Sequence, residues 1–207
     1  MKFLLSIAVL AAAGYASAQG TFEAIPDYSQ DAIAPVSGTA GWTFETTTDV
    51  TATDLGCFAN VFAKNLNLST VEVGLWAPGG ALLASTFISP GSSTLFDNSL
   101  YGAITPVLLS PGQIYQVGVF ALPDGNLSLD VSLGGSFTNT PDITVRGTAL
   151  GNTGTFAPPT EAQPADGAIY AGPNFRYVEG GVPEPCSGLL LCLGGLLLAA
   201  FRGNQRR

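Results

Sequence analysis

Residues 71–87 read Val71-Glu72-Val73-Gly74-Leu75-Trp76-Ala77-Pro78-Gly79-Gly80-Ala81-Leu82-Leu83-Ala84-Ser85-Thr86-Phe87. Two apolar runs, 71–76 and 81–87, flank the turn-forming segment 77–80. Runs of this length on either side of a Pro-Gly-Gly turn predict a β-hairpin. This stretch therefore favours a domain built from short strands.

The same pattern extends in both directions along the chain. Residues 42–46 alternate apolar and polar side chains, as a half-buried strand does, and residues 50–58 predict a second strand. Further on, residues 114–120 and 127–133 flank the turn segment 123–126, which predicts a second hairpin. Turn signals recur about every eight to twelve residues, which is typical of a sandwich or barrel. We expect an all-β, antiparallel β-sandwich, Ig-like or jelly-roll-like.

The rest of the chain sets the expected domain limits. Residues 134–167 are rich in loop-forming residues, with a short strand at 143–147, and residues 168–170 and 174–178 predict closing strands. We expect a signal peptide at 1–18, an N-terminal extension at 19–40, the sandwich domain at 41–179 and a C-terminal segment at 180–207.

Charge is scarce and unevenly placed. Charged residues make up 11% of the chain, and the net charge is −8. All 15 acidic residues lie between Glu23 and Glu184, and the only basic residues in that span are Lys64, Arg146 and Arg176. Such an acidic body repels nucleic acid, so we expect no nucleic-acid partner. It suits solubility outside a cell, and it could also attract cations or basic partners.

The sequence holds few groups for catalysis. It contains no histidine, which excludes His-based general bases, Ser-His-Asp and Cys-His arrangements and ordinary zinc sites. Cys57 lies in a predicted strand and is expected to be a small core group. A Ser-Lys dyad would have to use Lys64, in a predicted loop. We expect a protein that is not an enzyme, with no catalytic residues.

Carboxylates are the remaining candidates for acid-base chemistry or metal binding. Paired carboxylates could act as in glycosidases; the candidate pairs are Asp49 with Asp54, Asp124 with Asp130, and Glu161 with Asp166. Most adjoin turns, where Asp is common for structural reasons. We expect no cofactor and no metal ligand, with calcium the ion best suited to such oxygen atoms.

Aromatic side chains leave a second function open. Aromatic rings stack on sugars, and the candidates are Trp42, Trp76, Tyr101, Tyr115 and Tyr170. Most fall in predicted strands, where the alternative is packing in the core. A row of exposed rings would indicate a glycan reader.

The N-terminal segment has the three parts of a secretory signal peptide. Lys2 precedes an apolar stretch from Phe3 to Ala13, and a small-x-small site follows at Ala16-Ser17-Ala18. We expect signal peptidase to cut between Ala18 and Gln19.

The C-terminal segment also has three parts. Pro183, Glu184 and Pro185 are followed by an apolar run at 188–201, which is short for a membrane span, and then by Arg202, Arg206 and Arg207. The prolines break regular structure, and the arginines favour a cytoplasmic C-terminus.

Residues 182–207 resemble the PEP-CTERM sorting signal in all three parts. Proteins with this signal belong to Gram-negative bacteria that make extracellular polysaccharide. The resemblance implies that a membrane protease, exosortase, recognises Pro183, Glu184 and Pro185. Cys186 departs from the Ser or Thr that is commoner there; it is either a reactive or lipidated thiol or a tolerated small residue.

Residues 38–135 are similar to a domain of unknown function found in bacterial surface proteins. The similarity rests on Gly41-Trp42-Thr43-Phe44, Val50 to Gly56, Val73-Gly74-Leu75-Trp76, Leu82 to Ser85, Leu108 and Pro111 to Tyr115. It implies a β-sandwich-like fold and supplies no catalytic residues.

Together these features predict a non-enzymatic protein of the cell envelope or extracellular matrix. The expected partners are the secretion machinery and signal peptidase, exosortase, the inner membrane for a time, and extracellular polysaccharide. We expect export, tethering to the inner membrane through the C-terminal helix, and then release to the surface or outside. The alternative is a carbohydrate-binding module or adhesin.

Overall fold

A computed structural model describes residues 20–122, 126–133, 136–151, 154–159, 161–162 and 168–180. The expected signal peptide, sorting motif and membrane helix lie outside these residues. Within the described ranges, no helix is long and apolar enough to cross a membrane.

Most of the described chain is β-structure, and every strand pair in it is antiparallel. One short helix, α2 (Ala59–Lys64), interrupts it. The strands are β1 (Thr21–Glu23), β2 (Asp27–Tyr28), β3 (Ala32–Ser37), β4 (Thr39–Thr46), β5 (Val50–Phe58), β6 (Val71–Trp76), β7 (Leu82–Ile88), β8 (Thr94–Phe96), β9 (Ser99–Leu109), β10 (Tyr115–Ala121), β11 (Asn126–Ser132), β12 (Phe137–Thr138), β13 (Ile143–Gly151), β14 (Glu161–Ala162), β15 (Ile169–Ala171) and β16 (Pro173–Glu179).

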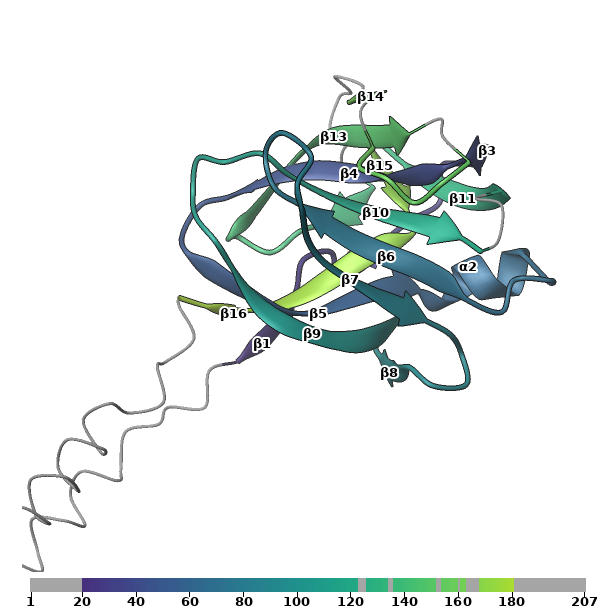
Figure 1. Ribbon diagram of the computed structural model, residues 1–207, viewed down its shortest axis with the longest axis horizontal. Coiled ribbons are helices and arrows are strands. Elements are labelled where there is room, and N and C mark those ends of the chain that lie inside the picture. The colour runs from purple at the N-terminus through teal and green to yellow at the C-terminus, as the bar shows by residue number, and fades with distance from the viewer. Residues whose placement is uncertain are drawn as a thin grey trace, which may run out of the picture.

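Two large sheets form the sandwich (Figure 1). One has the strand order β1-β16-β5-β9-β8, and the other has the order β14-β13-β4-β10-β6-β7. Two smaller sheets, β15-β11-β3 and β12-β2, extend it. The all-β, sandwich-like architecture expected from the sequence is thereby confirmed.

Aromatic side chains fill the space between the two large sheets. Phe175 of β16 packs against Phe44 and Trp42 of β4, with ring centroids 4.9 and 5.9 Å apart. All three side chains are buried, and the indole Nε1 of Trp42 donates a hydrogen bond to the carbonyl of Pro173 at 3.0 Å. Burial of rings of this size contributes much of the stability of a small core.

The hairpin at 71–87 forms as predicted. Strands β6 and β7 pair, and the turn between them is closed by Ala77 N donating to Ala81 O at 2.8 Å. Gly79 and Gly80 both have a φ of 88°, a backbone conformation that favours glycine.

The prediction of a second hairpin, between residues 114–120 and 127–133, is wrong. Strand β10 pairs with β4 on one side and β6 on the other, whereas β11 pairs with β3 and β15 in a different sheet. Both edges of β10 are therefore occupied, and β11 has no edge of β10 on which to pair. The turn signal at 123–126 indicated where β10 ends, but it did not indicate which strands β11 would pair with.

The stretch expected to precede the domain contributes strands to it. Strand β1 pairs with β16, β2 with β12 and β3 with β11. The segment at 143–147 is also longer than expected, because β13 runs on to Gly151 along β4.

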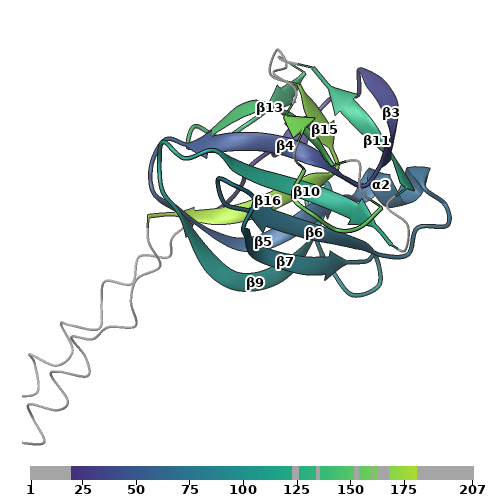
Figure 2. The ribbon, with the colours of Figure 1, turned by 45° about the horizontal axis from the view of Figure 1, so that its top comes forward.

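The two ends of the described chain lie together. Thr21 is the register partner of Val178, so the chain enters and leaves the sandwich through neighbouring strands. In Figures 1 and 2 these strand ends lie at one end of the body, and α2 lies at the opposite end.

Candidate functional site

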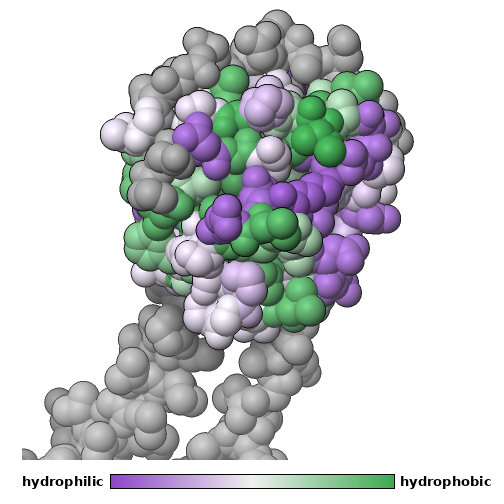
Figure 3. Space-filling model, turned by 90° about the vertical axis from the view of Figure 1, so that its right-hand side faces the viewer, coloured by the Kyte–Doolittle hydropathy of each residue, from purple (hydrophilic) through white to green (hydrophobic). Residues whose placement is uncertain are grey.

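The strongest candidate site lies at the α2 end of the body, around Tyr28. Tyr28 belongs to β2, and its ring packs on Phe58 at the end of β5, with centroids 4.6 Å apart. Figure 3 looks onto this end of the molecule, where a band of hydrophilic side chains crosses between apolar ones.

A polar network fixes the position of Tyr28. Its hydroxyl donates to Oδ2 of Asp130 at 3.0 Å, and the amide nitrogen of Asn60 donates to the same carboxylate oxygen at 2.7 Å and to the Tyr28 hydroxyl. Lys64 forms an ion pair with the other oxygen of Asp130 and donates to Gln30 at 2.7 Å. Since Asp130 is only 2% exposed, this charge is buried and compensated.

Helix α2 holds two of these side chains, and Asn65 anchors it. The Asn65 amide nitrogen donates to Val61 O at 2.8 Å and to Ser128 O at 3.0 Å, and its amide oxygen accepts from Ser128 N at 3.0 Å. Asn65 ends the helix and ties it to β11. Because Asp130 also belongs to β11, this contact places Lys64 of the helix beside Asp130.

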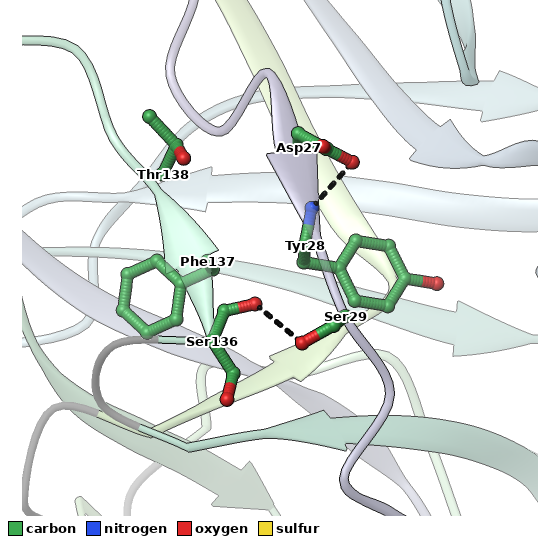
Figure 4. Close-up of a pocket in the computed structure, with 6 residues that line it drawn as sticks. All are labelled: Asp27, Tyr28, Ser29, Ser136, Phe137 and Thr138. Atoms are coloured by element: carbon green, nitrogen blue, oxygen red, sulfur yellow. Dashed lines mark hydrogen bonds between the residues drawn. The ribbon is translucent and has the colours of Figure 1, made fainter.

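Two hollows border β2 and share Asp27 and Tyr28. The larger has a volume of about 430 Å³ and is lined by Asp27, Tyr28, Phe58, Ala59, Asn60, Leu95, Asp97 and Asn98. The smaller, of about 260 Å³, is lined by Asp27, Tyr28, Ser29, Ser136, Phe137 and Thr138. In Figure 4 the rings of Tyr28 and Phe137, which are partners in the β2–β12 register, point to opposite sides.

The protonation state of Tyr28 follows from its surroundings. Burial raises the pKa of Tyr28 well above its usual value, and the neighbouring Asp130 carboxylate raises it further. The hydroxyl therefore stays protonated and acts as a hydrogen-bond donor. The oxygen Oδ1 of Asn60 is buried and has no hydrogen-bond partner in the described part of the chain.

A second network includes Glu23, which interacts with Asp97 of the larger hollow. Glu23 is 5% exposed and accepts a hydrogen bond from the Tyr101 hydroxyl at 2.6 Å. Burial raises the pKa of Glu23; the Tyr101 hydrogen bond opposes that shift, and nearby Asp97 adds to it. The guanidinium carbon of Arg176 lies over the Tyr101 ring, 4.8 Å from its centroid, and Nη2 of Arg176 forms an ion pair with Oδ1 of Asp54 at 2.9 Å.

Most of the sugar-stacking candidates are buried. Trp42, Trp76, Tyr101 and Tyr115 are all buried, and Tyr170 is half-buried. These five rings therefore do not form the exposed row that would have indicated a glycan reader.

Trp76 is buried in an unusual place, on the outer face of its sheet. It lies over Gly74 and Gly118, which are register partners on β6 and β10, and Phe156 packs on it at 5.2 Å. The two glycines leave space for the indole, because a Cβ at Gly74 would lie 2.5 Å from it.

The catalytic candidates are engaged in the fold. Cys57 is fully buried and unpaired, and burial raises the pKa of its thiol, which keeps it protonated and unreactive. Lys64 is committed to Asp130, and Asp54 to Arg176. Asp49 is exposed at the start of β5, while Asp124, Asp166 and the side chain of Glu161 lie outside what the structure describes.

Other predicted sites fall beyond the described ranges or are not seen within them. The cleavage site (Ala16, Ala18, Gln19), the sorting motif (Pro183, Glu184, Pro185) and the terminal arginines (Arg202, Arg206, Arg207) lie outside residues 20–180. Among the described residues, no three Cys, Asp or Glu side chains gather as a metal site would require.

Sequence reasoning missed the Tyr28 site because its members are far apart in the chain. They come from residues 27–28, 58–60, 95–98 and 130, and no local motif links them. The available sequence signal was the Asp97-Asn98 pair after the apolar residues Leu95 and Phe96, and it resembles an ordinary turn.

A scan against protein-family models finds no match to this chain, and a search of curated proteins finds none either.

Proposed function

We propose that this chain is a non-enzymatic, exported protein of the cell envelope or extracellular matrix, sorted through residues 182–207. In this proposal a signal peptide directs export, and a short helix at 188–201 holds the protein in the inner membrane until exosortase cuts near Pro183, Glu184 and Pro185. An Ig-like or jelly-roll-like assignment for the sandwich between these segments is part of the same proposal.

One structural observation supports this arrangement. Because Thr21 and Val178 are register partners, the segments before and after the body join it at the same end. A body joined in this way can be tethered at one end and present its α2 end, with the Tyr28 site, away from the tether (Figure 1).

The proposed lack of catalysis rests on how the few reactive side chains are used. The chain has no histidine, its buried thiol at Cys57 is held protonated, and Lys64 is paired with Asp130. These groups stabilise the fold instead of forming a nucleophile with its base.

The test compares three forms of the full chain in a host that has exosortase. The first is wild type, and the second replaces Pro183, Glu184 and Pro185 with alanine, which lets helix extend toward Val182. The matched control replaces Gly203, Asn204 and Gln205 with alanine in the same tail.

Wild type and control are expected to lose the tail and leave the membrane fraction. The motif variant is expected to stay in the membrane at full length minus the signal peptide. If all three remain intact and membrane-bound, the tail is an ordinary anchor and the sorting proposal is wrong.

A further inference from the structure

The larger hollow beside Tyr28 carries hydrogen-bonding groups that the fold does not use. Asn60 Oδ1 is buried without a partner among the described residues, and Asn98 presents an exposed amide while its backbone carbonyl accepts from Ala59 N at 2.8 Å. A buried polar atom left without a hydrogen bond costs about 1–3 kcal/mol, which a ligand or water can offset. The hollow therefore offers the exposed Asn98 amide to a hydrogen-bonding molecule, and Asn60, on its wall, has an amide oxygen that the fold leaves without a partner.

We propose that this hollow binds an uncharged oligosaccharide through Asp27, Asn60, Asp97 and Asn98. The inference depends on the proposed export only in that such glycans lie outside the cell. It uses none of the buried rings that the sequence suggested for stacking.

The polar lining suits sugar hydroxyls. Carboxylates accept hydrogen bonds, and side-chain amides both donate and accept, so neighbouring hydroxyl groups of a sugar find complementary partners in the Asp and Asn side chains here. They come from three separate segments, β2, α2 and the turn between β8 and β9, that together line the hollow.

The apolar lining suits the C–H faces of a sugar. Leu95 is 63% exposed on the wall of the hollow, and half-buried Tyr28 forms another part of it. Sites for small ligands combine an apolar lining with a few polar groups that set orientation, and their usual volumes, about 300–1,000 Å³, include this one.

The charges around the hollow select against anions. Asp27 and Asp97 line it, while the nearby cations are already paired, Lys64 with Asp130 and Arg176 with Asp54. A phosphate or uronate would meet carboxylates with no free cation among the described residues, so these charges disfavour an anionic sugar and leave a neutral one. The smaller hollow shares Asp27 and Tyr28, which gives room for an adjoining sugar unit.

The test uses the full chain, purified in mild detergent, with calorimetry and saturation-transfer NMR. The probes are maltohexaose, cellohexaose, mannohexaose, chitohexaose and, as the anionic comparison, hexagalacturonate; calcium chloride alone is a separate arm. The variants are Asn98→Ala and Asp27→Ala, two exposed lining residues. Asn67→Ala, an exposed asparagine outside the hollow, is the matched control.

We expect at least one neutral hexasaccharide to bind and hexagalacturonate not to bind. Loss of one or two hydrogen bonds in Asn98→Ala or Asp27→Ala should weaken binding about tenfold, and Asn67→Ala should leave it within about twofold. No binding by any neutral probe at about 5 mM would overturn the inference, as would equal binding by the lining variants or preference for hexagalacturonate. Calcium bound alone at Asp27 would assign the hollow to a metal instead. Failure here leaves the tail-cleavage assay unaffected, so the two proposals fail separately.

Discussion

The buried ion pair of Asp130 offers the most direct test of the described structure. Replacing Lys64 with methionine keeps most of the length and apolar stem of the side chain but removes its charge. Asp130, which is only 2% exposed, then stays behind without its cation.

The expected cost lies between two limits. Removing one partner of a buried ion pair costs about 3–5 kcal/mol, whereas exposed pairs contribute about 1 kcal/mol or less. Lys64 is 29% exposed, so water can reach Asp130 once the ammonium is gone, and the carboxylate keeps hydrogen bonds from Tyr28 and Asn60. We therefore expect Lys64→Met to lower the free energy of unfolding by about 2–3 kcal/mol.

Urea unfolding followed by tryptophan fluorescence measures this loss. Trp42 and Trp76 are 0% and 1% exposed, so both rings become exposed to water when the body unfolds. With a slope of about 2 kcal/mol per molar urea, the midpoint should fall by about 1–1.5 M. The double variant Asp130→Asn/Lys64→Met should recover much of the loss, because no buried charge remains.

Arg146→Met is the matched control. It also removes a cation from an ion pair, Arg146 with Glu45 at 2.6 Å, but this arginine is 50% exposed. Its midpoint is expected to stay unchanged. If Lys64→Met shifts the midpoint no more than Arg146→Met does, the network around Tyr28 does not hold a buried charge, and the reasoning fails.

Three further predictions concern the core. Cys57→Ser should cost about 1–3 kcal/mol because a buried hydroxyl needs a partner, and native Cys57 should resist thiol labelling, as mass spectrometry of its peptide would reveal. Gly74→Ala should cost about 1–3 kcal/mol and redshift the fluorescence, because its Cβ would lie 2.5 Å from the Trp76 ring, whereas Gly91→Ala, with open space, should do neither. Folding raises the pKa of Glu23, so this carboxyl favours the folded state at acidic pH and loses that contribution as the pH rises from about 4.5 through the higher folded value. Glu23→Gln should therefore gain stability relative to wild type between about pH 4 and about pH 7, and an unchanged difference in unfolding midpoint would contradict the assignment.

Local signals account for the parts of the fold that the sequence predicted. At 71–87, strand periodicity and turn chemistry lie within one short window, and the strand at 50–58 has the limits expected. Pairing between distant strands has no such window. The partners of β10 and β11 depend on which sheet edges remain free, and the register partners of β1, β2 and β3 all lie at least 89 residues away in the sequence.

Contacts between distant segments also explain why the Tyr28 site was not predicted. Asp130 appeared as one member of a possible pair with Asp124, but its actual partner is Lys64, which α2 brings to it. The helix itself gave little signal, since it has only six residues and no side-chain cap at Phe58. For the aromatic candidates, by contrast, burial gives the answer: four of the five are buried, and Tyr170 is half-buried.

The position of β16 has a consequence for when this protein can fold. Although it is the last described strand, it lies inside its sheet, between β1 and β5, and contributes Phe175 and Tyr177 to the core. A chain that emerges residue by residue cannot complete this sheet until position 179 is available, so the largest part of folding waits for nearly the whole body to be present. Such non-local closure slows folding and makes it depend on both ends at once. A chain cut short before Pro173 would leave β1 without a partner and β5 with an open edge that invites pairing with another chain.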